Sequence, residues 1–121
     1  MRILIFIILA GASFLTHAVD KSGNYAVWGA GRKSCFSYTS ARGSGKYDEF
    51  KYYTMGYLTA YNALIPDTYR ITGVESFPDV LSWLDKYCQK KPVHSFNRAI
   101  GDYIVAHHDS RLAHKPDNAG R

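Results

Sequence analysis

Apolar side chains recur every three or four residues over much of the chain, which is the spacing of an amphipathic helix. The longest such stretch covers residues 47–64 and stops before Pro66. Its apolar stripe consists of Phe50, Tyr53, Tyr57, Leu58, Tyr61 and Leu64. The pattern predicts one long helix, with Asp48 and Glu49 at the end where negative charge suits the helix dipole. Gly56, inside this helix, suggests a point where another helix approaches closely.

A second helix is predicted to begin at Ser76. Ser76, Pro78 and Asp79 match an N-cap, a proline in the first turn and the acidic partner of a capping box. The predicted buried face comprises Phe77, Val80, Leu81, Leu84, Tyr87 and Cys88. Pro92 ends this helix, and we expect it to open the next one.

The last predicted helix covers residues 92 to about 108. Its apolar positions are Val93, Phe96, Ile100, Tyr103, Ile104 and His107. Because the connection at Pro92 is so short, this helix and the one before it should pack as a hairpin or a sharp corner.

The remaining segments carry weaker patterns. Ser34 is a plausible N-cap for a short helix over residues 35–42, which the glycines at 43 and 45 would end. Residues 19–33 are rich in glycine and predict an extended arm, with Trp28 packed onto the domain. Residues 67–75 predict a loop, or alternatively an extended segment. Residues 109–121 are polar and predict a disordered tail.

These elements together predict a small single-domain all-α bundle of about four helices over residues 34–108. The first 18 residues are expected to lie outside it. Arg2 supplies a short positive region, residues 3–15 are apolar, and Thr16 and Ala18 are the small residues at −3 and −1 of a cleavage site after Ala18. This arrangement is typical of a secretory signal peptide. An uncleaved membrane anchor is the alternative, although the apolar run is shorter than the roughly 20 residues of a spanning helix.

Export changes how the two cysteines are interpreted. In an exported chain, Cys35 and Cys88 predict a single disulfide. Such a bridge closes a loop of about 54 residues, for which chain entropy suggests a stabilisation on the order of 4 kcal/mol. The bridge would brace a domain too small for a large hydrophobic core.

Charge narrows the choice of partner. Without Arg2 the chain keeps 14 basic and 10 acidic side chains, a net charge of +4. This modest excess favours an acidic partner or surface, but the basic residues form no dense run or nucleic-acid-binding motif. We therefore expect no nucleic-acid partner, and no membrane anchoring once the signal peptide is removed.

Candidate catalytic and metal-binding residues are sparse. His107 and His108 are adjacent, so they diverge by about 100° on a helix, and a metal site with His114 would require the tail to fold back. The interpretation we prefer is a solvated helix end. Asp79 and Asp85 do not share a helix face, and the chain has no GxSxG nucleophile motif. The sequence predicts a protein that is not an enzyme and has no cofactor or metal.

Tyrosine is the most informative residue type. The chain has ten tyrosines, and five of them lie between residues 47 and 61. An exposed aromatic cluster would indicate a protein-binding surface, and a tyrosine-rich core rim is the alternative. The candidate partner-binding residues are Tyr52, Tyr53, Tyr57 and Tyr61.

The order of these elements resembles a known family. A helix bearing Cys35 is followed by a long helix containing Met55-Gly56-Tyr57-Leu58, then by Trp83-Leu84-Asp85-Lys86-Tyr87-Cys88, Pro92 and a last helix. This arrangement resembles the HdeA/HdeB family of small periplasmic acid-stress chaperones and related exported proteobacterial proteins. Immunity proteins that neutralise secreted toxins in the periplasm have a similar helix and cysteine pattern.

The resemblance implies a periplasmic location, an all-helical fold and a homodimer as one expected state. It also implies a stress chaperone that binds unfolded clients. The chain departs from the acid chaperones in being basic, with an isoelectric point near 9.2. The alternative function is an inhibitor or immunity-type protein that binds one exported partner.

Overall fold

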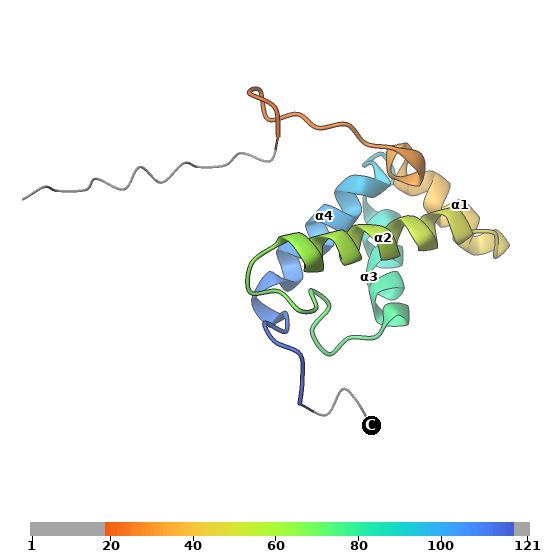
Figure 1. The fold of residues 1–121 in the computed structure, drawn as a ribbon. Helices are drawn as coiled ribbons and strands as arrows, with labels where there is room; N and C mark the ends of the chain where they lie inside the picture. Colours follow the sequence, from red (N-terminus) through yellow and green to blue (C-terminus); the bar gives the residue numbers. More distant parts are fainter. Residues whose placement is uncertain (1–18, 118–121) are drawn as a thin grey trace, which may run out of the picture.

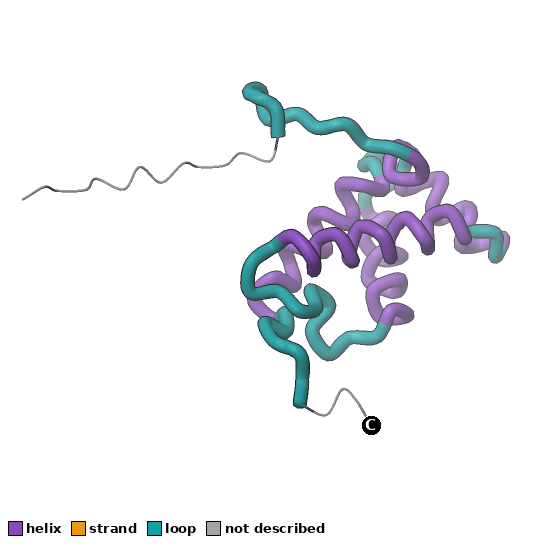
Figure 2. The backbone as a smooth tube through the Cα atoms, in the orientation of Figure 1, coloured by secondary structure: helices purple, strands orange, loops and turns teal. Residues whose placement is uncertain are grey.

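Four α-helices and two short 3₁₀ helices form the part of the chain that the structure, a computed structural model, describes, which is residues 19–117 (Figures 1 and 2). In chain order they are η1 (Gly29–Arg32), α1 (Cys35–Ser44), α2 (Asp48–Leu64), α3 (Phe77–Lys90), α4 (Phe96–His107) and η2 (His108–Ser110). No β-strand occurs within these residues, which confirms the predicted all-α bundle of four helices. The predicted signal peptide, residues 1–18, lies outside the described residues.

Aromatic side chains from three helices meet at the centre of the bundle. Tyr38 of α1 stacks on Phe96 of α4 at 4.7 Å, and Phe50 of α2 meets both rings edge-on at 5.5 and 5.0 Å. All three are at most 1% exposed. Aliphatic side chains, among them Val80, Leu84, Ile100 and Ile71, complete the core around them. The core therefore depends on every α-helix and on the loop before α3.

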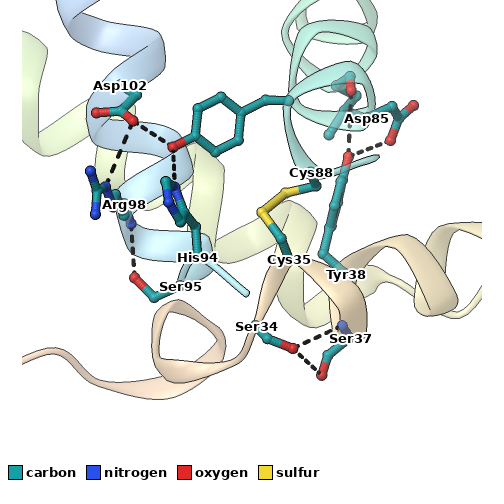
Figure 3. Close-up of a disulfide and its surroundings, with 12 residues drawn as sticks. Ser34, Cys35, Ser37, Tyr38, Asp85, Cys88, His94, Ser95, Arg98 and Asp102 are labelled. Carbon is teal, nitrogen blue, oxygen red and sulfur yellow. Dashed lines mark hydrogen bonds and ion pairs between the residues drawn. A yellow bond between two sulfur atoms is a disulfide. The ribbon is translucent and has the colours of Figure 1, made fainter. Parts of the chain in front are cut away.

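The predicted disulfide is present. Cys35 opens α1 and Cys88 lies in the last turn of α3, with their Cα atoms 4.7 Å apart and both residues fully buried (Figure 3). The bridge joins residues 53 positions apart. It closes the chain segment that contains α1, α2 and most of α3.

The helix starts follow the local sequence. The Ser34 hydroxyl accepts a hydrogen bond from the Ser37 amide, so Ser34 caps α1 as expected. At α3, Ser76 and Asp79 form the complete capping box, in which each side chain accepts from the other residue's amide. Gly45 ends α1 in the left-handed conformation, with φ at 72°. This conformation has little cost for glycine.

The expectation that Pro92 opens the last helix is wrong. Helix α4 begins at Phe96, with Ser95 as its N-cap, and Val93 is 88% exposed instead of lying on the buried face. The turn before Ser95 pairs with α1 instead. The amides of Cys35 and Phe36 donate to carbonyl oxygens in this turn. Because these carbonyls complete the bonding of α1's first turn, the segment after Pro92 is not helical.

The N-terminal arm also differs from the expectation. Only residues 25–28 lie outside any turn or helix, because the chain turns between Asp20 and Asn24, and residues 29–32 form η1 and bury Ala30 and Gly31 against the bundle. A Cβ atom at Gly31 would collide with the Tyr53 ring, so glycine permits this close approach. Trp28 does not pack onto the domain, since it is 79% exposed.

Two details of α2 are corrected by the packing. Among the described residues, nothing lies within 4 Å of the place that a Gly56 Cβ would occupy, so no helix approaches there. Leu64, which the stripe places on the buried face, is 78% exposed. The buried line of α2 consists instead of Phe50, Thr54 and Leu58.

The C-terminal segment is ordered for longer than expected. His108–Ser110 forms η2, and Leu112 pairs with Arg70 in an isolated bridge. The Arg111 guanidinium donates to the carbonyl oxygens of Asp67 and His108. The first residues of the predicted disordered tail are therefore held against the loop that follows α2. None of the helices in the described range is long and apolar enough to cross a membrane.

Candidate functional site

A groove of about 670 Å³ lies between the extended segment before η1 and helix α2. We call it the tyrosine groove, and we call residues 25–28, which form one of its walls, the rim segment. The residues lining it are Tyr25, Ala26, Val27, Trp28, Tyr53, Tyr57, Ala60, Tyr61, Leu64, Ile65 and Asn97. None of these side chains carries a formal charge. The site is therefore an apolar surface edged by hydroxyl groups and one amide.

Helix α2 supplies the main wall through its periodicity. Tyr53, Tyr57 and Tyr61 are four residues apart, so they stack along one side of the helix. Each is half-buried, because the adjacent line of Phe50 and Leu58 occupies the core. The three rings therefore have one face against the bundle and another toward the groove.

A buried amide ties the two walls together. Asn97 of α4 is 6% exposed, and its Oδ1 accepts a hydrogen bond of 2.7 Å from the Tyr53 hydroxyl. Its Nδ2 donates to the Tyr25 hydroxyl at 3.0 Å. Since buried amides require partners, this network holds the rim segment at a defined place beside α2.

Tyr53 and Tyr57 remain neutral at physiological pH. Burial raises the pKa of Tyr53 and of Tyr57 above the ordinary tyrosine value, and the nearby Tyr25 adds to the effect in both cases. A neutral hydroxyl donates and accepts hydrogen bonds. The groove thus offers polar contacts to a bound group without any charge of its own.

The structure brings together three of the four predicted partner-binding residues. Tyr53, Tyr57 and Tyr61 line the groove, whereas Tyr52 lies outside it, is 63% exposed and has the Lys51 ammonium 5.6 Å from its ring centroid. Tyr52 is one position from Tyr53, and this offset turns it onto another face of α2.

Sequence reasoning missed the rest of the groove. The rim residues Tyr25 and Trp28 lie in a segment without periodicity, and Asn97 is a polar residue within an apolar helix. Of these missed residues, Asn97 is the one whose role the sequence pattern could have indicated. A polar side chain on the buried face of a helix indicates a hydrogen-bonded partner.

The histidines differ from the expected solvated helix end. The His107 ring stacks on Tyr103 at 4.0 Å, and its Nε2 lies 3.5 Å from Glu75 Oε1. His108 Nδ1 lies 3.0 Å from the Tyr61 hydroxyl. These contacts fasten the loop before α3 and the end of α2 to the end of α4.

A third histidine, His94, belongs to a polar cluster with Asp102. Figure 3 shows this cluster across the disulfide from Tyr38 and Asp85. The Tyr87 hydroxyl donates to Asp102 Oδ2 at 2.5 Å and lies 2.8 Å from His94 Nδ1. Burial, together with the hydrogen bond to Asp102, raises the pKa of Tyr87 to about 12. A tyrosine with so high a pKa is a poor nucleophile at neutral pH.

Within residues 19–117, no three His, Cys, Asp or Glu side chains are grouped closely enough to hold a metal ion. The groove contains none of these residue types. The arrangement is suited to binding an apolar group by contact and by hydrogen bonds to hydroxyls.

Comparisons with protein-family models, with curated proteins and with solved structures find no match to this chain.

Proposed function

We propose that this chain is an exported, non-enzymatic protein-binding domain, an HdeA-like stress chaperone of the periplasm that binds apolar segments of unfolded clients in the tyrosine groove. The observation that carries the proposal is the groove itself. It is open, has no charged lining residue and exposes Tyr25, Trp28 and Leu64 at 59%, 79% and 78%. Exposed apolar patches of this kind mark interaction sites in soluble proteins.

The residue types support a protein partner. Tyrosine and tryptophan are enriched at protein interfaces, because each combines a large apolar body with a polar tip. Four tyrosines and one tryptophan line this single groove. An apolar segment bound there would bury its side chains against rings while its polar backbone meets hydroxyls.

Low pH would affect the contacts between the helices, whereas the side chains that line the tyrosine groove would stay uncharged. The Arg42 guanidinium binds both carboxylate oxygens of Asp85, at 2.9 and 2.8 Å, and this pair joins α1 to α3. Protonation of Asp85 at low pH would weaken that link. We therefore expect the groove to bind clients at neutral pH and the domain to loosen in acid.

The proposal is tested by suppression of aggregation. A reduced, carboxymethylated test protein would be mixed with the purified oxidised chain at pH 7 and at pH 3, and aggregation would be followed by light scattering. Trp28→Ala removes an exposed groove residue, so it should weaken client binding about tenfold. Tyr52→Ala removes a similarly exposed aromatic outside the groove and should leave binding unchanged. If the unmodified chain suppresses aggregation neither at pH 7 nor at pH 3, the proposal is refuted.

The second candidate is an inhibitor or immunity-type protein with one exported partner. The preformed network of Asn97, Tyr53 and Tyr25 favours it, because fixed polar groups provide specificity. Affinity capture from periplasm with the unmodified chain and with Trp28→Ala separates the candidates. One stoichiometric protein lost in the variant would indicate the specific partner, whereas many weakly held proteins would indicate the chaperone.

A further inference from the structure

The rim segment has an open backbone edge. Residues 25–28 lie outside any helix or turn, and at Trp28 the backbone is extended, with φ at −116° and ψ at 160°. Among the described residues, no group accepts a hydrogen bond from the four rim amides. The turn just before them is different, since the amides of Ser22 and Asn24 both donate to Asp20 Oδ1. In Figure 1 the chain before η1, drawn in orange, runs outside the helix bundle until it reaches η1.

The two walls of the groove are matched in length. Tyr53 and Tyr61 are eight residues apart on α2, which corresponds to about 12 Å along a helix. The rim segment spans three residue steps, which corresponds to about 10 Å in an extended chain. A stretch of four or five extended residues therefore matches the length of both walls.

We propose that the groove binds its client as an extended strand that pairs with the rim segment through main-chain hydrogen bonds. This inference rests on the proposed function and specifies the conformation of the bound segment. Alternate side chains of the strand would face Tyr53, Tyr57 and Tyr61, while the others face solvent, because side chains in a strand alternate. The preferred segment is thus four or five residues long, apolar at every second position and uncharged toward the groove.

The open edge favours an extended client over a helical one. A helix satisfies its own backbone groups, so it would cover the rim amides without accepting from them. An amide that is buried without a hydrogen-bond partner weakens the complex. An added strand supplies carbonyl oxygens at the required spacing, which is how extended peptides bind to exposed backbone edges in other proteins. The uncharged lining excludes a charged side chain from the groove, because it offers no counter-ion.

The test is hydrogen exchange at single-residue resolution, measured by NMR on the oxidised chain with and without saturating carboxymethylated test protein. In an extended segment, alternate amides point to the same side. Binding should therefore slow exchange at least tenfold at one alternate pair, either Tyr25 and Val27 or Ala26 and Trp28. Proline has no amide hydrogen. Its introduction at the protected position, as Ala26→Pro or Val27→Pro, should weaken binding about fivefold, and at the unprotected neighbour it should have little effect.

The outcomes distinguish this inference from the proposed function. If Trp28→Ala weakens binding but client slows exchange at none of the four rim amides, the groove is the binding site and the strand pairing is wrong. Equal binding by both proline variants and the unmodified chain would also overturn the pairing. If the unmodified chain does not bind the client, the proposed function fails and the pairing fails with it.

Discussion

Asp85 shows how one side chain connects packing with pH. Its carboxylate accepts hydrogen bonds from Arg42 and from the fully buried Tyr38, whose hydroxyl lies 2.8 Å away. Burial opposes ionisation of Asp85, but the hydrogen bonds from Arg42 and Tyr38 outweigh it, so the pKa lies below its usual range. No local pattern in the sequence indicates these contacts, because the partners are more than 40 positions away.

The lowered pKa sets the direction of a pH effect. The unfolded chain binds the Asp85 proton more readily than the folded chain does, so the stabilisation is complete above about pH 4 and is lost as the pH falls further. Asp85→Asn should lower the free energy of unfolding at pH 7 by about 1.5–3 kcal/mol. It should also flatten the dependence of stability on pH below 4. Urea denaturation at a series of pH values measures both effects.

Asp117→Asn is the matched control for this pH effect, because Asp117 is exposed near the end of the described chain. It should leave the unfolding free energy and its pH dependence unchanged. An Asp85→Asn variant as steeply acid-sensitive as the unmodified chain would contradict the role of the Arg42–Asp85 pair. The slope will not vanish entirely, since hydrogen bonds from Ser76 also lower the pKa of Asp79.

At the scale of elements, two glycines have opposite roles. Gly31 lets η1 lie directly on the Tyr53 ring of α2, which places the rim segment beside the groove. Gly56 lies in the middle of α2 with open space beside it among the described residues. The first glycine is required by tertiary packing, whereas the second only weakens the helix that contains it.

Alanine substitution separates these two roles. Gly56→Ala should raise the free energy of unfolding by about 0.5–1 kcal/mol, because alanine restricts the unfolded chain and favours helix. Gly31→Ala should lower it by about 1–3 kcal/mol, because the added methyl group overlaps the Tyr53 ring. Thermal unfolding followed by circular dichroism measures both changes. Stabilisation by Gly31→Ala would show that η1 does not pack against Tyr53 as described.

At the scale of the whole molecule, the disulfide constrains most of the bundle. The bridge ties the start of α1 to the end of α3, and both cysteines belong to the hydrophobic core. Domains of this size are stable by only about 5–15 kcal/mol. One cross-link is therefore a large share of the stability of this fold.

Reduction of the disulfide should show directly how much the bridge contributes to the stability of the fold. Loss of the Cys35–Cys88 bridge should lower the free energy of unfolding by up to about 4 kcal/mol, because the reduced unfolded chain regains the entropy of a 53-residue separation. The measurement is urea denaturation with and without a reductant. The double variant Cys35→Ser and Cys88→Ser serves as the control, since reductant should not change its midpoint. Equal midpoints for the oxidised and reduced chain would contradict the predicted contribution.

Local sequence was sufficient for most of the helices. The start of α3 was predicted by Pro78 in its first turn and by Ser76 and Asp79, whose side chains cap the helix within that turn. The disulfide was predicted because two cysteines in a chain expected to be exported allow a single internal pairing. The four-residue spacing of Tyr53, Tyr57 and Tyr61 placed them on one face of α2. These features depend on bonds or periodicity within a few residues.

Tertiary structure alone decided the groove, the start of α4 and the path of the arm. Asn97 bonds to Tyr53 across 44 positions and to Tyr25 across 72, so no local pattern indicates the site that they form. The turn at Pro92 is not helical because its carbonyls bond to the first turn of α1. The sequence determined where the four α-helices lie, apart from the start of α4, since the hydrogen bonds within a helix are local. Packing determined which tyrosine faces lie beside an open backbone edge, since that arrangement joins distant parts of the chain.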